Sequence, residues 1–178
     1  QALLSQIPRR PDEQYTLEKV YYFTARISHY QRSDPQKVMR QKVYHRAIES
    51  TGVEIIEGMF REKELGCHNC GQPYRTHEEK MTDVAIACKA LELCYKNETD
   101  AIVFVTGDTD QIPPLQYVKS HFSNVKRVVA FPWKRVNREL RLYADSDVSL
   151  SPSSYQSNQF PDTIIPAQGK PITKPPTW

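Results

Sequence analysis

The amino-acid sequence predicts an α/β fold with three layers, in which a parallel sheet is covered by helices on both faces. Short segments rich in β-branched and aromatic residues alternate along the chain with longer segments of helical pattern. One short segment, 101–105 (AIVFV), contains no polar residue, as expected of a strand that is buried on both sides. Strands that alternate with helices favour parallel strands joined by helical crossovers.

Helix-start and helix-stop signals divide the first half of the chain. The predicted segments are the end of a helix at 1–7, a strand at 19–27, a helix at 35–50, a strand at 53–57, an irregular insert at 58–76 and a helix at 76–96. Asp34 is expected to cap the helix that starts at Pro35, and Gly52 follows its end. Thr76 and Glu79 match the pattern of a capping box for the next helix.

The second half of the chain continues the alternation. The predicted segments are a strand at 101–106, a helix at 111–122, a strand at 125–131, a helix at 136–144 and a short strand at 148–150. Pro113 and Pro114 fall in the first turn of a helix, where proline is tolerated. The helix at 76–96 has an apolar stripe at helical spacing, formed by Val84, Cys88, Leu91 and Tyr95.

Composition and charge indicate a soluble domain followed by a tail of different character. Of the 178 residues, 39% are hydrophobic and 25% charged, the net charge is +3, and no apolar run is long enough to cross a membrane. The four cysteines do not suggest a secreted disulfide framework, so we expect a cytoplasmic location. Proline enrichment in 151–178 predicts that residues 1–150 form one domain and 151–178 an extended tail.

Three aspartates carry the strongest functional signal. Asp108 and Asp110 follow the strand at 101–106, at the edge where parallel sheets bind ligands, and Gly107 permits a tight turn there. Asp83 comes from the preceding helix, on a face that continues with small apolar residues. Carboxylates that converge repel one another unless a cation lies between them, and oxygen ligands favour Mg²⁺ or Mn²⁺. Such a cation suits phosphodiester hydrolysis.

Each of these acids also has an ordinary structural explanation. Asp108 or Asp110 could serve only as the cap of the helix that follows, and Asp83 only as a partner of a helix dipole. One such acid alone is better explained in this way, whereas the set of three favours a functional site.

Several segments of the sequence resemble the NYN family of PIN-like ribonucleases, in particular its bacterial members. These segments are 79–87 (EKMTDVAIA), 100–110 (DAIVFVTGDTD), 113–115 (PPL), 22–25 (YFTA), Arg40-Gln41 with Tyr44, 128–132, Phe160-Pro161-Asp162, Pro175 and Trp178. The resemblance implies a PIN-like, Rossmann-like fold and metal-dependent cleavage of RNA. It also implies that Asp83, Asp108 and Asp110 are the catalytic, metal-binding acids.

The sequence departs from this family at its beginning. The family has a further aspartate at the end of a first strand, which precedes the helix whose last turns would be residues 1–7. Neither that strand nor its acid occurs in this sequence. Because a sheet without this central strand would be incomplete, we expect both to lie upstream of residue 1.

Basic and polar residues are expected near the same edge as the acids. The candidate substrate-binding residues are Lys80, Thr106, Lys134, Arg135 and Arg138. Lys80, on the predicted helix at 76–96, could hold a phosphate oxygen. Lys134, Arg138 and Arg141 would share a helical face and follow the RNA backbone, and Trp133 could stack on a base. The competing interpretation is a solvated basic face with a packed tryptophan.

A pair of cysteines in the predicted insert has the spacing of zinc ligands. Cys67 and Cys70 lie three residues apart, and His77 follows nearby. A structural Zn²⁺ held by these three residues would take its fourth ligand from Glu64, His68 or another chain. The alternative is a pair of reduced thiols in an ordered loop.

The residues and the resemblance together predict a Mg²⁺- or Mn²⁺-dependent ribonuclease that cleaves RNA endonucleolytically. Products with a 5′-phosphate are what the resemblance implies. Single-stranded RNA is the favoured substrate, and homo-oligomerisation is left open. One alternative is a catalytically silent module that binds RNA or a partner. Another is a Toprim-like phosphoryl-transfer domain, in which Glu57 would supply the required glutamate. The sequence contains no fingerprint of an acyl-transfer enzyme, a P-loop NTPase or a dinucleotide-binding domain.

Overall fold

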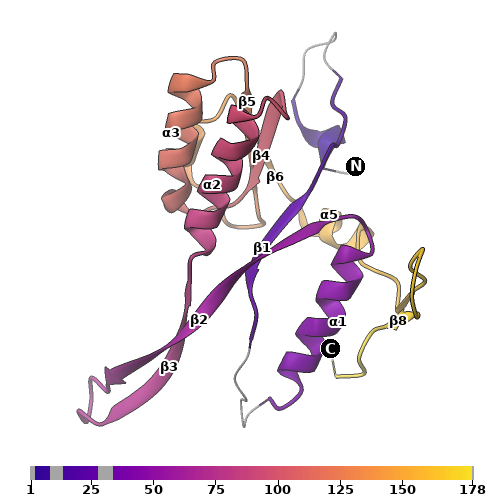
Figure 1. The fold of residues 1–178 in the computed structure, drawn as a ribbon. Helices are drawn as coiled ribbons and strands as arrows, with labels where there is room; N and C mark the ends of the chain where they lie inside the picture. Colours follow the sequence, from indigo (N-terminus) through magenta and orange to yellow (C-terminus); the bar gives the residue numbers. More distant parts are fainter. Residues whose placement is uncertain (1–2, 9–13, 28–33, 178) are drawn as a thin grey trace. The chain divides into compact units, whose positions relative to one another are not determined.

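Strands and helices alternate along the chain, which confirms the predicted α/β class (Figure 1). The structure is a computed structural model that describes residues 3–8, 14–27 and 34–177. The expectations for residues 1–2 and for Trp178 lie outside the described residues. The chain divides into a first unit of residues 1–18 and 86–159 and a second unit of residues 19–85 and 160–178, each with its own three-stranded sheet.

The sheet of the first unit is parallel throughout. Its strands are β4 (Ala101–Val105), β5 (Lys126–Phe131) and β6 (Ser146–Ser149), with β5 in the centre. The helical elements are η1 (Leu4–Gln6), α2 (Thr82–Tyr95, which begins in the second unit), η2 (Thr109–Gln111), α3 (Ile112–His121), α4 (Arg138–Arg141) and α5 (Pro152–Ser157). Every residue of β5 after Lys126 is buried, as expected of the central strand of a covered parallel sheet.

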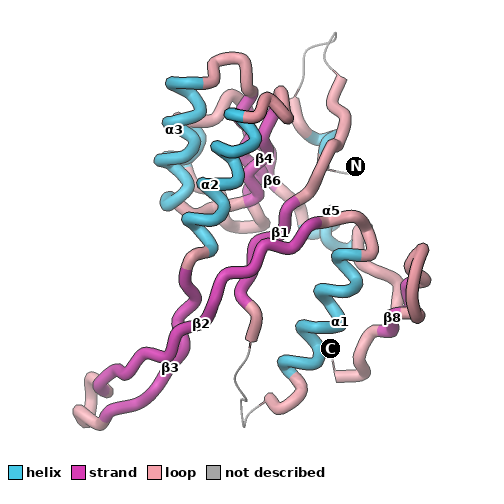
Figure 2. The backbone as a smooth tube through the Cα atoms, in the orientation of Figure 1, coloured by secondary structure: helices cyan, strands magenta, loops and turns pink. Residues whose placement is uncertain are grey.

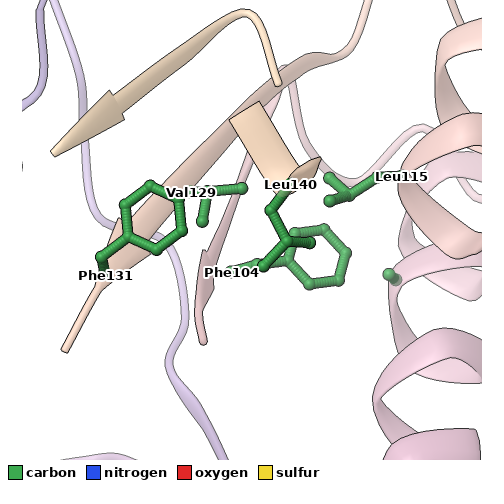
Figure 3. Close-up of a cluster of buried hydrophobic side chains, with 6 residues drawn as sticks. Phe104, Leu115, Val129, Phe131 and Leu140 are labelled. Carbon is green, nitrogen blue, oxygen red and sulfur yellow. The ribbon is translucent and has the colours of Figure 1, made fainter. Parts of the chain in front are cut away.

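Apolar side chains from β4, β5 and the adjacent helices form the core of the first unit (Figure 3). The buried cluster consists of Ala90, Phe104, Leu115, Val129, Phe131 and Leu140, none of which is more than 5% exposed. Burial of a Leu, Val or Phe side chain stabilises a fold by roughly 1.5–3 kcal/mol. This cluster therefore fixes the positions of β4 and β5, whose carboxyl ends lead into the candidate site.

The apolar stripe predicted for the helix at 76–96 is wrong at three of its four positions. Val84, Cys88 and Tyr95 are exposed, whereas Leu91 is partly buried against a core cluster. The buried side of α2 is formed instead by Ala90 and Cys94, which are 5% and 1% exposed, with Ile86 partly buried against the same core. Small side chains at four-residue spacing let a helix approach a sheet closely, and this advantage is not apparent from hydrophobicity alone.

The sheet of the second unit combines a parallel and an antiparallel pair. Its strands are β1 (Tyr21–Ala25), β2 (Glu54–Gly66) and β3 (Pro73–Lys80), and α1 (Lys37–Glu49) connects the parallel pair β1 and β2. Gln41 of α1 holds the end of β1. Its Nε2 donates to the carbonyl of Ala25 at 2.9 Å, and its Oε1 accepts from the amide of Ile27 at 2.8 Å.

The irregular insert predicted at 58–76 is instead a β-hairpin formed by β2 and β3 (Figure 2). The antiparallel register runs from the pair Met59–Lys80 to the pair Gly66–Pro73. Thr76 and Glu79, which we expected to form a capping box, lie within β3, and α2 begins only at Thr82. Charged residues on both faces of the hairpin conceal the apolar–polar alternation by which a strand is recognised.

The first helix of the second unit begins later than predicted. Its N-cap residue is Gln36, which makes no side-chain capping bond. Asp34, the expected cap, pairs instead with the guanidinium of Arg40, whose Nη1 donates to Oδ1 at 2.9 Å. This hydrogen bond from Arg40 lowers the pKa of the Asp34 carboxyl.

The tail at 151–178 is not extended throughout. Ser151 caps the short helix α5, because its Oγ accepts a hydrogen bond from the amide of Ser154 at 3.2 Å. Further on, β7 (Thr163–Ile164) and β8 (Ile172–Thr173) form an antiparallel pair, in which Ile172 is buried and β8 contacts α1. In the part of the chain that the structure describes, neither the tail nor any other segment forms a helix that could span a membrane.

Candidate active site

Two of the three predicted metal-binding acids lie in one turn after β4, residues 106–110, which we call the acidic turn. The amide of Asp108 donates to Oγ1 of Thr106 at 3.0 Å, and the amide of Asp110 donates to Oδ1 of Asp108 at 3.1 Å. Asp108 is therefore the N-cap of η2, which was the structural explanation considered for it. The cap uses one carboxylate oxygen, and a carboxylate has a second oxygen with which to bind a cation.

The acidic turn combines an exposed surface with a buried anchor. Asp108 and Asp110 are exposed, whereas the next residue, Gln111, is 1% exposed. One helical turn later, Leu115 is fully buried in the core of the first unit. The burial of Gln111 and Leu115 thus anchors the segment that holds the two acids at the surface. The burial of Gln111 could not be predicted from the sequence, because a single glutamine beside two acids shows no periodicity.

The loop after β5 lies directly against the acidic turn. A Cβ at Gly107 would lie 2.4 Å from the carbonyl oxygen of Arg135, closer than real Cβ atoms approach any backbone atom. In addition, the amide of Thr106 donates to the carbonyl of Ala130 at 3.1 Å, and α4 contacts η2. We call residues 132–138 the basic loop. Its contact with the acidic turn lies entirely within the first unit.

The basic loop presents cations next to an exposed aromatic ring. Lys134, Arg135 and Arg138 are exposed, and Trp133 is 51% exposed. Lys134 adopts the left-handed conformation (φ +59°), and its Nζ lies 4.4 Å from the centre of the Trp133 ring. An ammonium over an exposed tryptophan ring gains roughly 0.5–1 kcal/mol. This gain holds the charge of Lys134 close to the ring.

The helical face predicted for Lys134, Arg138 and Arg141 does not form. Lys134 lies in the loop, because Asn137 caps α4 by accepting a hydrogen bond from the amide of Glu139 at 2.9 Å. Arg141 lies on α4 but pairs with Asp147, and its Nε donates to Oδ2 at 3.0 Å. The candidate contacts for an RNA backbone are therefore reduced to Lys134, Arg135 and Arg138.

Asp83, the third predicted acid, lies exposed in the first turn of α2. It precedes Ile86, which packs against the core of the first unit, by about one helical turn. By the division of the chain, however, Asp83 belongs to the second unit, and the acidic turn belongs to the first. No group of three or more metal-binding side chains forms among the residues that the structure describes. The convergence of the three acids therefore stays a prediction.

Lys80 lies on a strand and not on the helix predicted at 76–96. It is the last residue of β3, paired with Met59, and its Nζ lies 3.0 Å from the Glu78 carboxylate. Met81, with φ +80°, separates it from α2. A contact between Lys80 and a phosphate would require this exposed ion pair to open, which costs less than about 1 kcal/mol.

The three expected zinc ligands are not brought together. Cys67 and Cys70 lie in the loop that joins β2 to β3, whereas His77 lies within β3, opposite Glu62. The loop ends where β3 begins, at Pro73, so His77 is about 13 Å further along the strand. Hydrogen bonds from the backbone amides of Asn69 and Cys70 lower the pKa of the Cys67 thiol.

Glu57, the residue that a Toprim-like site would need, has a partner in the second unit. It lies in β2 opposite Thr24, and its Oε1 accepts a hydrogen bond from Nε of Arg26 at 3.0 Å. This ion pair between neighbouring parallel strands accounts for the residue structurally.

The chain is similar to known proteins in sequence and in fold. A family model described as NYN domain matches residues 3–151. The chain is 27% identical to 6-hydroxy-3-succinoylpyridine 3-monooxygenase HspA from Pseudomonas putida, over 89% of this chain and 57% of that protein. It thus spans little more than half the length of this curated relative. A crystal structure of a protein of unknown function from Vibrio parahaemolyticus superposes with a TM-score of 0.51 at 18% identity, over 75% of this chain and 69% of the other, which indicates a shared fold.

Proposed function

Because this chain belongs to the NYN domain family, a family of nuclease-like proteins, we propose that it is a metal-dependent ribonuclease that cleaves RNA endonucleolytically. Asp83, Asp108 and Asp110 would hold Mg²⁺ or Mn²⁺, and the basic loop would hold the RNA backbone. The close approach of Gly107 to Arg135 is the observation that carries this proposal. It brings the turn that carries the carboxylates against the loop that carries the cations, at the carboxyl edge of a parallel sheet, where such folds bind their ligands.

The donor set of the acidic turn suits a hard divalent cation. Both of its candidate ligands are exposed carboxylates, and Mg²⁺ and Mn²⁺ prefer oxygen. The amide of Asp110 fixes the orientation of the Asp108 carboxylate through the 3.1 Å hydrogen bond to Oδ1. A ligand that is already oriented loses little conformational entropy when the cation binds. For Asp83 the support comes from its position in the first turn of α2 and from the family.

The remaining residues would bind and orient the RNA. When bound, the cation would activate water and neutralise charge on the scissile phosphate. Lys134, Arg135 and Arg138 would attract the neighbouring phosphates. Their positive charges would also offset the repulsion between the RNA backbone and the carboxylates of the acidic turn. The exposed Trp133 ring offers a surface on which an unpaired base could stack, which favours single-stranded RNA. Hydrolysis of this type leaves a 5′-phosphate and needs no protein nucleophile.

The proposal can be tested by cleavage of an unstructured, end-labelled RNA with Mn²⁺. The full gene product is compared with Asp108→Asn and with the matched control Asp100→Asn, which lies just before β4, at the opposite end of the strand from the acidic turn. We expect Asp108→Asn to lose roughly a hundredfold or more in rate, because a catalytic cation contributes several kcal/mol. Asp100→Asn should cleave like the unaltered protein, and a chelator should abolish cleavage by both.

Three outcomes would count against the proposal. Equal cleavage by Asp108→Asn and the unaltered protein would point to a contaminating nuclease. Metal-independent binding of RNA without cleavage would favour the alternative of a catalytically silent RNA-binding module. An equal response of both aspartate variants would show that the acidic turn has no special role.

A second candidate function comes from the Pseudomonas putida relative, which is named as a monooxygenase. Monooxygenation needs dioxygen and a reductant, and this sequence contains no G-x-G-x-x-G fingerprint for a dinucleotide. The chain also spans only 57% of that relative. Incubation with 6-hydroxy-3-succinoylpyridine and a reduced nicotinamide, followed by measurement of oxygen uptake, separates the two functions. We expect no uptake above the level without protein.

A further inference from the structure

Among the residues that the structure describes, no apolar core covers the outer part of the β2–β3 hairpin. Within those residues, β1 pairs with residues 54–58 of β2, and residues 59–66 of β2 pair with β3 alone. Residues 61–64 are all exposed. Exposed ion pairs link the strands, such as Lys63–Glu78 at 3.2 Å and Arg75–Glu62 at 3.1 Å, but each contributes at most about 1 kcal/mol. Two strands without a core are marginally stable in water, so the hairpin needs a further stabilising interaction.

The loop at the end of this hairpin is a closely hydrogen-bonded turn around two cysteines. The amide of Cys67 donates to the carbonyl of Gln72 at 2.9 Å, and the amide of Gly71 donates to the carbonyl of Cys67 at 2.8 Å. Gly71 has φ +72°, a conformation that favours glycine. The backbone from Cys67 to Gln72 therefore forms one compact loop. Any residue other than glycine at position 71 would strain the backbone of this loop.

Within this loop the two sulfurs lie together. The amides of Asn69 and Cys70 donate hydrogen bonds to the Cys67 side chain, which also forms a hydrogen bond with the side chain of Cys70. Both cysteines are free thiols, and Cys70 is exposed. Two adjacent sulfurs at an exposed loop, one of them accepting backbone amides, form a preorganised pair of ligands for a thiophilic cation.

We propose that Cys67 and Cys70 form half of a tetrahedral zinc site, which the same two residues of a second copy of this chain complete. Structural zinc is bound by four protein ligands, and four cysteines are a common set. A two-fold axis through the metal gives each chain an identical role, which is the usual symmetry of homodimers. The site belongs to the second unit, whereas the acidic turn belongs to the first, and it does not depend on the proposed ribonuclease activity.

No other described residue of the same unit completes the site. No group of three potential metal ligands occurs among the described residues of either unit. Glu64, the nearest acid on β2, lies opposite Arg75 in the ladder, and His77 lies well inside β3. A second hairpin loop supplies two further thiolates without any rearrangement of the first.

A redox role fits the same residues less well. Cysteine pairs that exchange between thiol and disulfide are typically activated at the N-terminus of a helix. Cys67 and Cys70 lie instead between two β-strands. Their loop therefore lacks the helix N-terminus that activates redox cysteines, and its hydrogen bonds orient the Cys67 sulfur.

The test is titration of Zn²⁺ into the reduced, metal-free full gene product, with the mass followed by analytical ultracentrifugation. We expect a dimer that contains about one zinc ion per two chains. Cys67→Ser and Cys70→Ser should stay monomeric, whereas Cys88→Ser, which removes an exposed thiol from α2, should dimerise like the unaltered protein. Co²⁺ as a substitute should give the sulfur-to-metal absorption that carboxylate ligands do not produce.

A second measurement covers the case in which the serine variants do not fold. In the unaltered protein, zinc should protect Cys67 and Cys70 from alkylation by iodoacetamide but leave Cys88 reactive. One zinc ion per monomeric chain would overturn the shared site. Zinc binding that survives Cys67→Ser would overturn it as well. Formation of a Cys67–Cys70 disulfide by oxidised glutathione, with no zinc bound by the reduced protein, would identify a redox pair instead.

Discussion

The carbonyl oxygen of Arg135 occupies the space into which any side chain at Gly107 would extend, since a Cβ there would lie only 2.4 Å from it. This contact joins the acidic turn after β4 to the basic loop after β5. The two segments are separated in the sequence by α3 and β5, and the buried cluster around Phe104 and Val129 holds those elements in place. Steric exclusion therefore requires glycine at position 107.

Gly107→Ala should destabilise the protein by about 1–3 kcal/mol, because one of the two loops must move to admit the methyl group. The movement should also lower RNA cleavage, since it separates the acids from the cations. Urea denaturation measures the first effect and the cleavage assay the second. The matched control is Gly66→Ala, whose Cβ would meet nothing closer than 3.9 Å. If both variants unfold at the same urea concentration, the contact between Gly107 and Arg135 does not contribute to stability.

Asp145→Ala should destabilise the first unit by about 3 kcal/mol, because it leaves a buried guanidinium without its partner. The side chain of Arg127 is 7% exposed and pairs with Asp145, which also accepts the amide of Arg127 at 2.8 Å. Asp147→Ala removes the partner of Arg141, a side chain that is 45% exposed, and should cost less than about 1 kcal/mol. Chemical denaturation measures the free energy of unfolding of the two variants. Equal losses of this free energy would contradict the argument that the burial of Arg127 makes its ion pair the more important one.

Glu92 should titrate well below the ordinary range. Hydrogen bonds from Lys89 and Lys96 lower its pKa from 4.5 to about 2. Because the folded-state pKa is the lower one, the ion pairs stabilise the protein above pH 4.5 and lose this effect as the pH falls toward 2. An NMR titration of the Glu92 carboxyl carbon at low salt measures the midpoint. Lys89→Met should raise it toward the ordinary value, and an ordinary midpoint in the unaltered protein would refute the prediction.

Arg138→Glu should weaken RNA binding and reduce the dependence of affinity on salt. Loss of one phosphate contact lowers the slope of log K against log salt by about 1. The matched control is Lys119→Glu, an exposed residue of the last turn of α3, at the opposite end of that helix from the acidic turn. Binding should be measured with Ca²⁺ in place of Mn²⁺, to prevent cleavage. An equal change of slope in both variants would show that only the net charge matters.

The sequence predicted the first unit better than the second. The strand β5 is buried after its first residue, whereas β4 is only partly buried and ends on Val105, which is 55% exposed. The continuous apolar segments 101–105 and 128–131 nevertheless mark both strands clearly. The sequence predicts an irregular insert in place of the β2–β3 hairpin, because the two exposed faces of the hairpin carry charges instead of an apolar alternation. It does not predict the buried side of α2 either, since Ala90 and Cys94 have smaller side chains than the exposed Val84 and Tyr95.

In the candidate site, the position of the acidic turn followed from a general rule about the ends of parallel strands. The contact between Gly107 and Arg135 did not follow, because it depends on the tertiary approach of two loops. Nor could the sequence show that Arg141 pairs with Asp147 and that Lys134 lies outside the helix. Which cations remain accessible to a phosphate is decided by side-chain partners, and residue type alone does not reveal them.

The measurement that tests the account most directly is Mn²⁺ binding by isothermal titration calorimetry. The full gene product is compared with Asp83→Asn, Asp108→Asn and the double variant. If the two acids share one cation, each single variant should bind at least about tenfold more weakly, and the double variant should lose little more, because the effects of joint ligands are not additive. Binding by Asp83→Asn that equals that of the unaltered protein would contradict the shared metal site.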